Sequence, residues 1–144
     1  MEFETQEQLE ACLAEWQERL FLTDWTIKVR FAAPEELKDE NEIRLSGQNE
    51  FQIVNKCAVI SLEKLNDDTR NRIVKICHEQ ILIHELLHCK YNWIEPPYTA
   101  EGKYFDTLEH SLIEQMAKSL FMAKYNLPFS WFNNFDGDNA NDTT

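Results

Sequence analysis

Hydrophobic and polar positions recur along the chain with two different periods, and these periods predict its helices and strands. Residues 5–21 place Leu9, Leu13 and Trp16 at spacings of three and four, which predicts an amphipathic helix. Trp25–Phe31 alternates apolar and polar residues and predicts a half-buried strand. A short helical turn is expected at 34–37. Further strands are expected at Ile43–Leu45, Phe51–Val54 and Cys57–Leu62.

Two long helical patterns follow in the second half of the chain. Asn66 and Asp67 are good capping residues before an apolar pattern that covers about 68–93 and ends at Pro96-Pro97. A last helix is expected over about 101–125. The order of elements predicts an α+β fold with an N-terminal helix, a small, mostly antiparallel sheet of three or four strands, and two long helices. We expect one domain over 1–132 and a disordered acidic tail over 133–144.

Composition and charge narrow the classes of partner. The net charge of −12 and the absence of a basic cluster in the sequence argue against nucleic-acid binding, which needs grouped Lys and Arg. No apolar run approaches the roughly 20 residues of a membrane span. The N-terminus is polar and acidic, and the four cysteines form no CxxC pair. These features indicate reduced thiols in a cytoplasmic protein.

The sequence His84-Glu85-Leu86-Leu87-His88 is an HExxH motif within the first of the two long helical patterns. Two imidazoles four residues apart lie one turn apart on one helix face, and they suit Zn²⁺. Glu85 is rotated away from them and can act as general base toward a water that the metal activates. The alternative is two ordinary histidines with an incidental Glu. Burying two histidines and a carboxylate in one turn is costly without a partner, which favours one Zn²⁺ per chain. The ligands also suit Fe²⁺.

A catalytic zinc needs a third protein ligand. The pattern HExxHxxGxxH is excluded because Tyr91 and Ile94 occupy the Gly and final His positions. The last helix therefore supplies the candidates. Its expected core stripe contains Phe105, Leu108, Leu112, Met116 and Leu120.

Glu109 lies near the middle of that stripe, where a carboxylate needs a cation, so Glu109 is the favoured third ligand. His110, at the edge of the stripe, is the alternative ligand. Otherwise it orients a ligand, stabilises an oxyanion or is an ordinary, partly exposed helix histidine. Glu114 points away from the stripe and is expected to be a solvated charge. Tyr98 and Tyr104 could donate a hydrogen bond to an oxyanion. His78 does not share the face of His84, and a structural or surface role is expected.

HExxH followed by a Glu on the next helix resembles the gluzincin arrangement of zincin metallopeptidases. The strings LTDWTIKVRF, CAVISL, ILIHELLHC and LEHSLIEQMAKSL also look like small metallopeptidase-like proteins of phages and prophages. The resemblance covers roughly residues 20–122. It implies a minimal zincin-like domain in a bacterial host, with His84, His88 and Glu109 as ligands and Glu85 as base. It also implies that substrate adds to an exposed sheet edge, here Cys57–Leu62.

The chain departs from that family in two respects. Thermolysin-like gluzincins have an Asp four residues after the ligand Glu, where this chain has Ile113. From its length of 144 residues we also expect no second domain of the kind that shapes the substrate cleft in larger members.

Three functions follow from these patterns. The first is a zinc-dependent peptidase that acts on a peptide or protein. The second is a non-catalytic, zinc-stabilised module that binds a host or phage protein. The third, a DNA-linked protease of the SprT-like type, is disfavoured by the charge.

Overall fold

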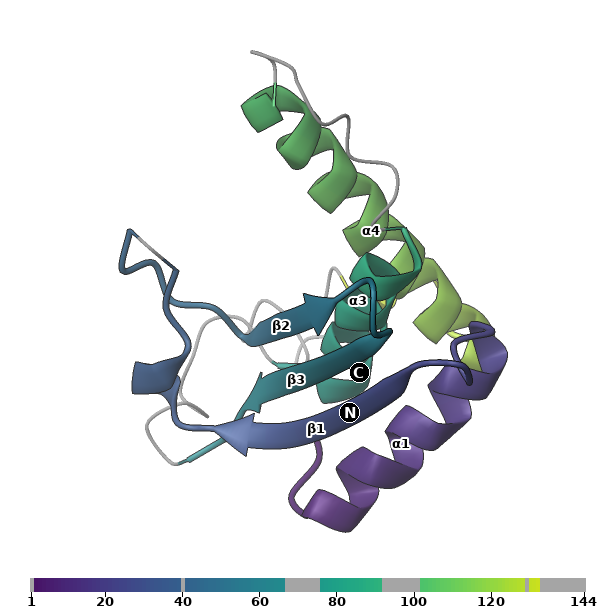
Figure 1. Ribbon diagram of the computed structural model, residues 1–144. Coiled ribbons are helices and arrows are strands. Elements are labelled where there is room, and N and C mark those ends of the chain that lie inside the picture. The colour runs from purple at the N-terminus through teal and green to yellow at the C-terminus, as the bar shows by residue number, and fades with distance from the viewer. Residues whose placement is uncertain (1, 40, 67–75, 92–101, 129, 133–144) are drawn as a thin grey trace.

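The helices and strands follow the order that the sequence predicts. The computed structural model describes residues 2–39, 41–66, 76–91, 102–128 and 130–132, with the backbone alone at 102–106. Its elements are α1 (Gln6–Arg19), β1 (Thr26–Ala32), the 3₁₀ turn η1 (Pro34–Glu36), β2 (Gly47–Gln52), β3 (Cys57–Glu63), α3 (His78–Lys90) and α4 (Gly102–Tyr125) (Figure 1). The α+β prediction is confirmed: an N-terminal helix, a three-stranded sheet and two packed helices. The domain limits stay a prediction, and the expected tail at 133–144 lies outside the described residues.

A capping box starts α1. The Thr5 hydroxyl accepts a hydrogen bond from the Gln8 backbone N–H, and the Gln8 side chain accepts one from Thr5 N–H. These two bonds satisfy backbone donors that the first helical turn leaves without partners. The helix then buries Leu9, Leu13 and Trp16, which were the apolar positions of the predicted stripe.

The sheet is mixed, with the order β1-β3-β2. β1 pairs with β3 in parallel, and β2 pairs with β3 antiparallel, so the expectation of a mostly antiparallel sheet was wrong. The strand expected at Ile43–Leu45 was also wrong, because that segment forms only an isolated bridge between Arg44 and Lys38. β2 lies earlier in the chain than the expected Phe51–Val54. Ile53 and Val54, the last residues of the expected strand, instead belong to the turn before β3, where Lys56 has a positive φ.

β3 is the central strand and not an exposed edge, which corrects the expectation for Cys57–Leu62. Ala58, Ile60 and Leu62 are buried, and the strand has neighbours on both sides. A short, continuous apolar run is typical of a strand enclosed on both sides, whereas the polar sequence of β2 is typical of an edge.

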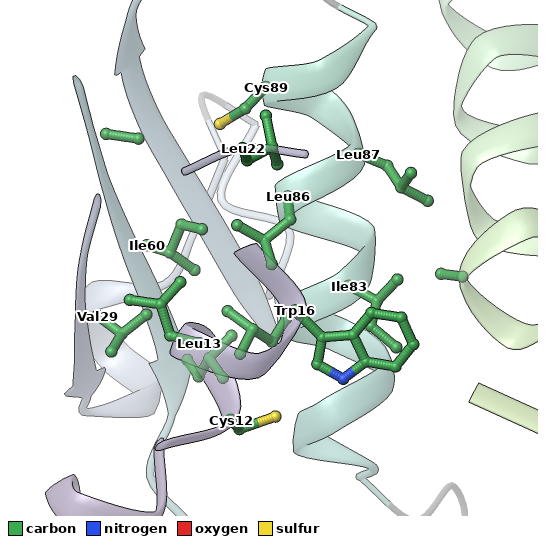
Figure 2. Close-up of a cluster of buried hydrophobic side chains, with 14 of the residues drawn as sticks. Cys12, Leu13, Trp16, Leu22, Val29, Ile60, Ile83, Leu86, Leu87 and Cys89 are labelled. Atoms are coloured by element: carbon green, nitrogen blue, oxygen red, sulfur yellow. The ribbon is translucent and has the colours of Figure 1, made fainter. Parts of the chain in front are cut away.

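The main core lies between the sheet and the two helices α1 and α3. Figure 2 shows Val29 and Ile60 of the sheet pointing toward Leu13 of α1 and Leu86 of α3. α4 packs on the side of α3 that faces away from the sheet, through buried Ile113, Ala117 and Phe121. α3 is therefore enclosed between two layers, so most of its side chains are buried.

Cys77 is extended, so α3 begins at His78 and is not continuous with a helix from about residue 68, as the sequence led us to expect. Tertiary contacts account for this start. The ring of His78 accepts a hydrogen bond from the Phe3 backbone N–H at Nδ1, and its Nε2 lies 2.7 Å from the Glu63 carbonyl oxygen. His78 is 0 % exposed, so its role is structural. Residues 67–75 lie outside the described part of the chain.

A buried polar cluster joins α1, α3 and α4. Glu79 of α3 is 1 % exposed and accepts hydrogen bonds from the Trp16 indole and the Tyr125 hydroxyl. Lys124 bridges the same carboxylate and Glu15 of α1. The charge of Glu79 is therefore compensated by a cation and two neutral donors.

Candidate metal centre

α3 places the HExxH residues as their spacing predicts. His84 and His88 lie one turn apart, with ring centroids 4.9 Å apart and their Nε2 atoms separated by 3.1 Å. Both imidazoles are half-buried at the side of α3 that α4 approaches. Glu85 is turned toward β2 instead, as a residue about 100° further round the helix must be.

A third histidine joins the pair from α4. The His110 ring lies 4.7 Å from that of His88 and 5.7 Å from that of His84, centroid to centroid. One nitrogen from each of the three rings lies within 4.8 Å of the other two, so the group could hold a metal ion. Three neutral imidazoles are a known ligand set for zinc, and they leave a fourth position open. The donor chemistry and spacing therefore fit Zn²⁺.

The rotation of α4 determines which residue approaches the motif. The helix packs on the face that carries Ile113, Ala117 and Phe121, and His110 lies on the same face, one turn before Ile113. The apolar stripe expected to face the core is centred about 120° away, and Leu108 and Leu112 are 50 % and 54 % exposed.

Glu109 follows the stripe rather than the packed face, and it does not belong to the histidine group. It is half-buried, and its role as a ligand stays a prediction. The residue of α4 that lies beside His84 and His88 is His110, which the sequence left open as the alternative ligand. The signal that could have found it is the spacing His110, Ile113, Ala117, Phe121, which is also a helical stripe.

Glu114 is a partner of the site and not the solvated charge that was expected. Its Oε2 lies 2.6 Å from Nδ1 of His84, and its Oε1 accepts a hydrogen bond from the Gln80 amide. Lys118 lies 3.5 Å from the same carboxylate. The contact makes Nδ1 of His84 the donor and leaves Nε2 free to bind a metal. Thermolysin-like gluzincins have an Asp four residues after the ligand Glu, and Ile113 stands at that position here. Glu114, four residues after His110, supplies a carboxylate that orients His84 instead.

The electrostatics of the three histidines differ. Burial and the neighbouring His84 and His110 rings lower the pKa of His88 to about 4, so this ring is neutral near pH 7, as a ligand must be. Burial opposes the charging of His84, but the Glu114 hydrogen bond and the charge of Glu85 outweigh it and raise the pKa of His84. Burial likewise disfavours the Glu114 anion, yet its contact with His84 lowers the pKa of that carboxyl overall.

Glu85 is 8 % exposed and lies where Gly47 of β2 comes close to α3. A Cβ on Gly47 would lie 2.6 Å from Ile81 Cγ2 and 3.3 Å from Glu85 Oε1, so only glycine allows this approach. The Asn49 amide donates a hydrogen bond to the Glu85 backbone carbonyl at 2.8 Å, which ties the strand to the helix. Burial raises the pKa of Glu85 to about 7, which is the range a general base uses.

A cavity of about 670 Å³ opens between β2 and the helices. Its walls include His84, Glu85, His88 and His110, with Gly47 and Phe51 on the strand side. The volume is typical of sites that bind small molecules or parts of a peptide. The strand along this cavity is β2, an edge of the described sheet.

Two further candidates are not tested. Tyr98 and the side chain of Tyr104 lie outside the described residues.

Among the helices that the structure describes, none combines the length and apolar character needed to cross a membrane. Comparison of the chain with protein-family models, curated proteins and solved structures finds no match.

Proposed function

We propose that the chain is a zinc-dependent peptidase in which His84, His88 and His110 hold the metal. The observation that supports this most directly is the convergence of three imidazole nitrogens within 4.8 Å. Tetrahedral zinc with Zn–N bonds of about 2.0–2.1 Å separates its ligand nitrogens by about 3.3 Å. The 3.1 Å between the Nε2 atoms of His84 and His88 is close to that value. Glu109 was the favoured ligand from sequence, and here we propose His110 in its place.

The chemistry requires a base beside the metal, and Glu85 suits this role. A zinc ion bound there supplies Lewis acidity, which polarises a scissile carbonyl and makes water easier to deprotonate. Glu85 accepts the proton of the attacking water and then delivers it to the leaving amine. Glu114 keeps His84 in the tautomer that binds metal through Nε2. A purely structural zinc site has no need of a buried carboxylate on the adjacent face.

The substrate that we propose is an extended peptide segment paired with β2. An edge strand offers unpaired backbone groups, and an added peptide strand can hydrogen-bond to them. β2 lines the cavity from Gly47 to Phe51, next to Glu85. This assigns to β2 the role that sequence analysis expected for Cys57–Leu62.

Substitution of Glu85 tests the catalytic part of the proposal. We expect the zinc-loaded Glu85→Gln variant to keep its metal and its melting temperature but to cleave a random peptide library at least about 100-fold more slowly. Equal cleavage by variant and wild type would exclude Glu85 as the base. Zinc binding by a wild-type protein that cleaves no peptide would instead favour the non-catalytic binding module.

Paired substitutions on α4 test the ligand set. His110→Ala should weaken zinc binding far more than Glu109→Ala, as measured by competition with a chromogenic chelator. Both variants remove one side chain from the same turn, so each is a control for the other. The opposite ranking would restore Glu109 as the third ligand.

A further inference from the structure

The outer face of α4, opposite the face that packs on α3, has an unusual composition for a surface helix. Over residues 107–123, whose side chains the structure describes, the residues that point away from α3 are uncharged, and Glu114 and Lys118, with side chains 38 % and 40 % exposed, pair with each other beside them. The face carries Leu108, Ser111, Leu112, Gln115, Ser119 and Ala123. The exposed residues of α1, in contrast, include Glu7, Glu10, Glu18 and Arg19. In a chain of net charge −12, an uncharged helix face differs from what the composition leads one to expect of the surface.

Three of the polar side chains on this face make hydrogen bonds within the helix. The Gln115 amide donates to the Ser111 hydroxyl at 3.2 Å, and the Ser119 hydroxyl donates to the Gln115 carbonyl at 2.8 Å. Burying a polar group is costly mainly when it loses its hydrogen bond. Another surface could therefore cover these side chains at little cost, while also covering two leucines that are each about half exposed.

We propose that the outer face of α4 binds the same face of a second copy of this chain, as an antiparallel helix pair. A two-fold axis between residues 115 and 116 sets Leu108 against Ala123 of the other copy, and Leu112 against its Ser119. Each large side chain then meets a small one, so the face is complementary to itself, as a two-fold contact requires. This contact does not involve the metal centre.

Charge favours a second copy at this face over other faces. Two molecules of net charge −12 repel each other, and the repulsion is least where the facing side chains are neutral. A single helix face gives an interface at the small end of the specific range. We therefore expect a reversible dimer that forms at micromolar to submillimolar concentrations.

Sedimentation equilibrium of the full chain tests the contact. Wild type should show a concentration-dependent monomer–dimer equilibrium, and Leu112→Glu should weaken it at least tenfold. Ile53→Glu is the matched control, because Ile53 is also 54 % exposed but lies in the β2–β3 turn, and it should leave dimerisation unchanged. Circular dichroism checks that each variant is folded. A monomeric wild type at all concentrations, or equal weakening by both substitutions, overturns the proposal.

Disulfide trapping tests the register. In a Cys57→Ser background, a mixture of Leu112→Cys and Ser119→Cys chains should form a mixed covalent dimer on mild oxidation. Each variant alone should form far less, because equivalent residues 112 would be about 10 Å apart along the helix axis, beyond the reach of a disulfide. Equal trapping in the single variants and in the mixture would contradict the antiparallel register.

Discussion

Individual residues around α3 hold the side chains and backbone of the HExxH motif in place. Glu114 orients His84, Asn49 holds the backbone of Glu85, and Gly47 lets β2 approach the helix. Each acts through a neighbour rather than on substrate. Their substitutions should therefore alter the geometry or affinity of the site while leaving the three histidines in place.

Glu114→Gln should weaken zinc binding by about 10–100-fold, which is the usual effect of losing a carboxylate that orients a ligand histidine. The reason is that a neutral amide holds the His84 tautomer less firmly. Chelator competition measures the affinity. Gln115→Glu, at the next and exposed position, is the control and should bind zinc as wild type does; equal affinities for Glu114→Gln and wild type would remove Glu114 from the site.

Gly47→Ala should destabilise the protein by about 1–3 kcal/mol, the usual result of overpacking a tight contact. The added Cβ would lie 2.6 Å from Ile81 Cγ2 and must push β2 away from α3. Urea denaturation measures the loss. Gln52→Ala, at the exposed end of the same strand, should have little effect, and similar losses for the two variants would argue against a specific close approach.

At the scale of elements, buried polar contacts hold the helices in register with one another and with the sheet. Glu79 connects α3 to α1 and α4, and His78 connects the start of α3 to the N-terminal segment and to the end of β3. These contacts fix where α3 begins and how it is rotated. The positions of His84 and His88 follow from that rotation.

Lys124→Met should destabilise the protein by about 3 kcal/mol, because it leaves the 1 %-exposed Glu79 carboxylate without its cation. Thermal or urea unfolding measures the change. The double variant Lys124→Met, Glu79→Gln should recover part of the loss, since it removes the uncompensated charge. A double variant that is no more stable than Lys124→Met alone would contradict this account.

His78 should make stability fall in mild acid. Burial lowers the pKa of His78, although the contact with the Glu63 backbone carbonyl and the charge of Glu2 partly oppose this. The unfolded chain therefore binds a proton at this residue from about pH 6.5 downward, while the folded chain does not. The contribution of neutral His78 is fully present above pH 6.5 and is lost as the pH falls toward the lowered folded pKa.

The stability difference between wild type and His78→Gln should accordingly narrow between pH 7 and pH 5. Urea unfolding across that range measures it, and the variant controls for the other acids. An offset that stays constant with pH would show that His78 does not titrate differently in the folded and unfolded chains.

At the scale of the whole molecule, the histidine group connects two layers. His84 and His88 belong to α3, which packs on the sheet, whereas His110 belongs to α4 on the outer side. A metal ion held by all three would join these layers, so binding should stabilise the entire fold.

Zinc at about 1,000 times its dissociation constant should raise the free energy of unfolding by about 4 kcal/mol. A strong chelator should reverse the rise in melting temperature, as measured by differential scanning calorimetry. His110→Ala should lose most of the response. A zinc response that is equally large in His110→Ala would show that the stabilising metal is bound elsewhere.

Local patterns in the sequence determined most of the secondary structure and the centre of the site. Apolar patterns alone located α1, β1, β3 and α4, because α1, β1 and α4 have regular spacings of apolar residues and β3 is a short apolar run rich in β-branched residues. The spacing of HExxH alone placed His84 and His88 on one face and Glu85 on another, because helix geometry is local.

Tertiary structure decided what depends on contacts between distant segments. α4 has two apolar stripes, and only packing against α3 selected the one with His110 and turned Leu108 and Leu112 outward. The order of the strands likewise made β2 an edge and β3 the centre of the sheet. This order cannot be read from the residues of one strand, because it depends on which strands pair with it on each side. Packing therefore decided that His110 joins the HExxH histidines and that β2 is the edge strand beside them. The energy of this packing is shared among residues far apart in the chain, so a local pattern does not determine it.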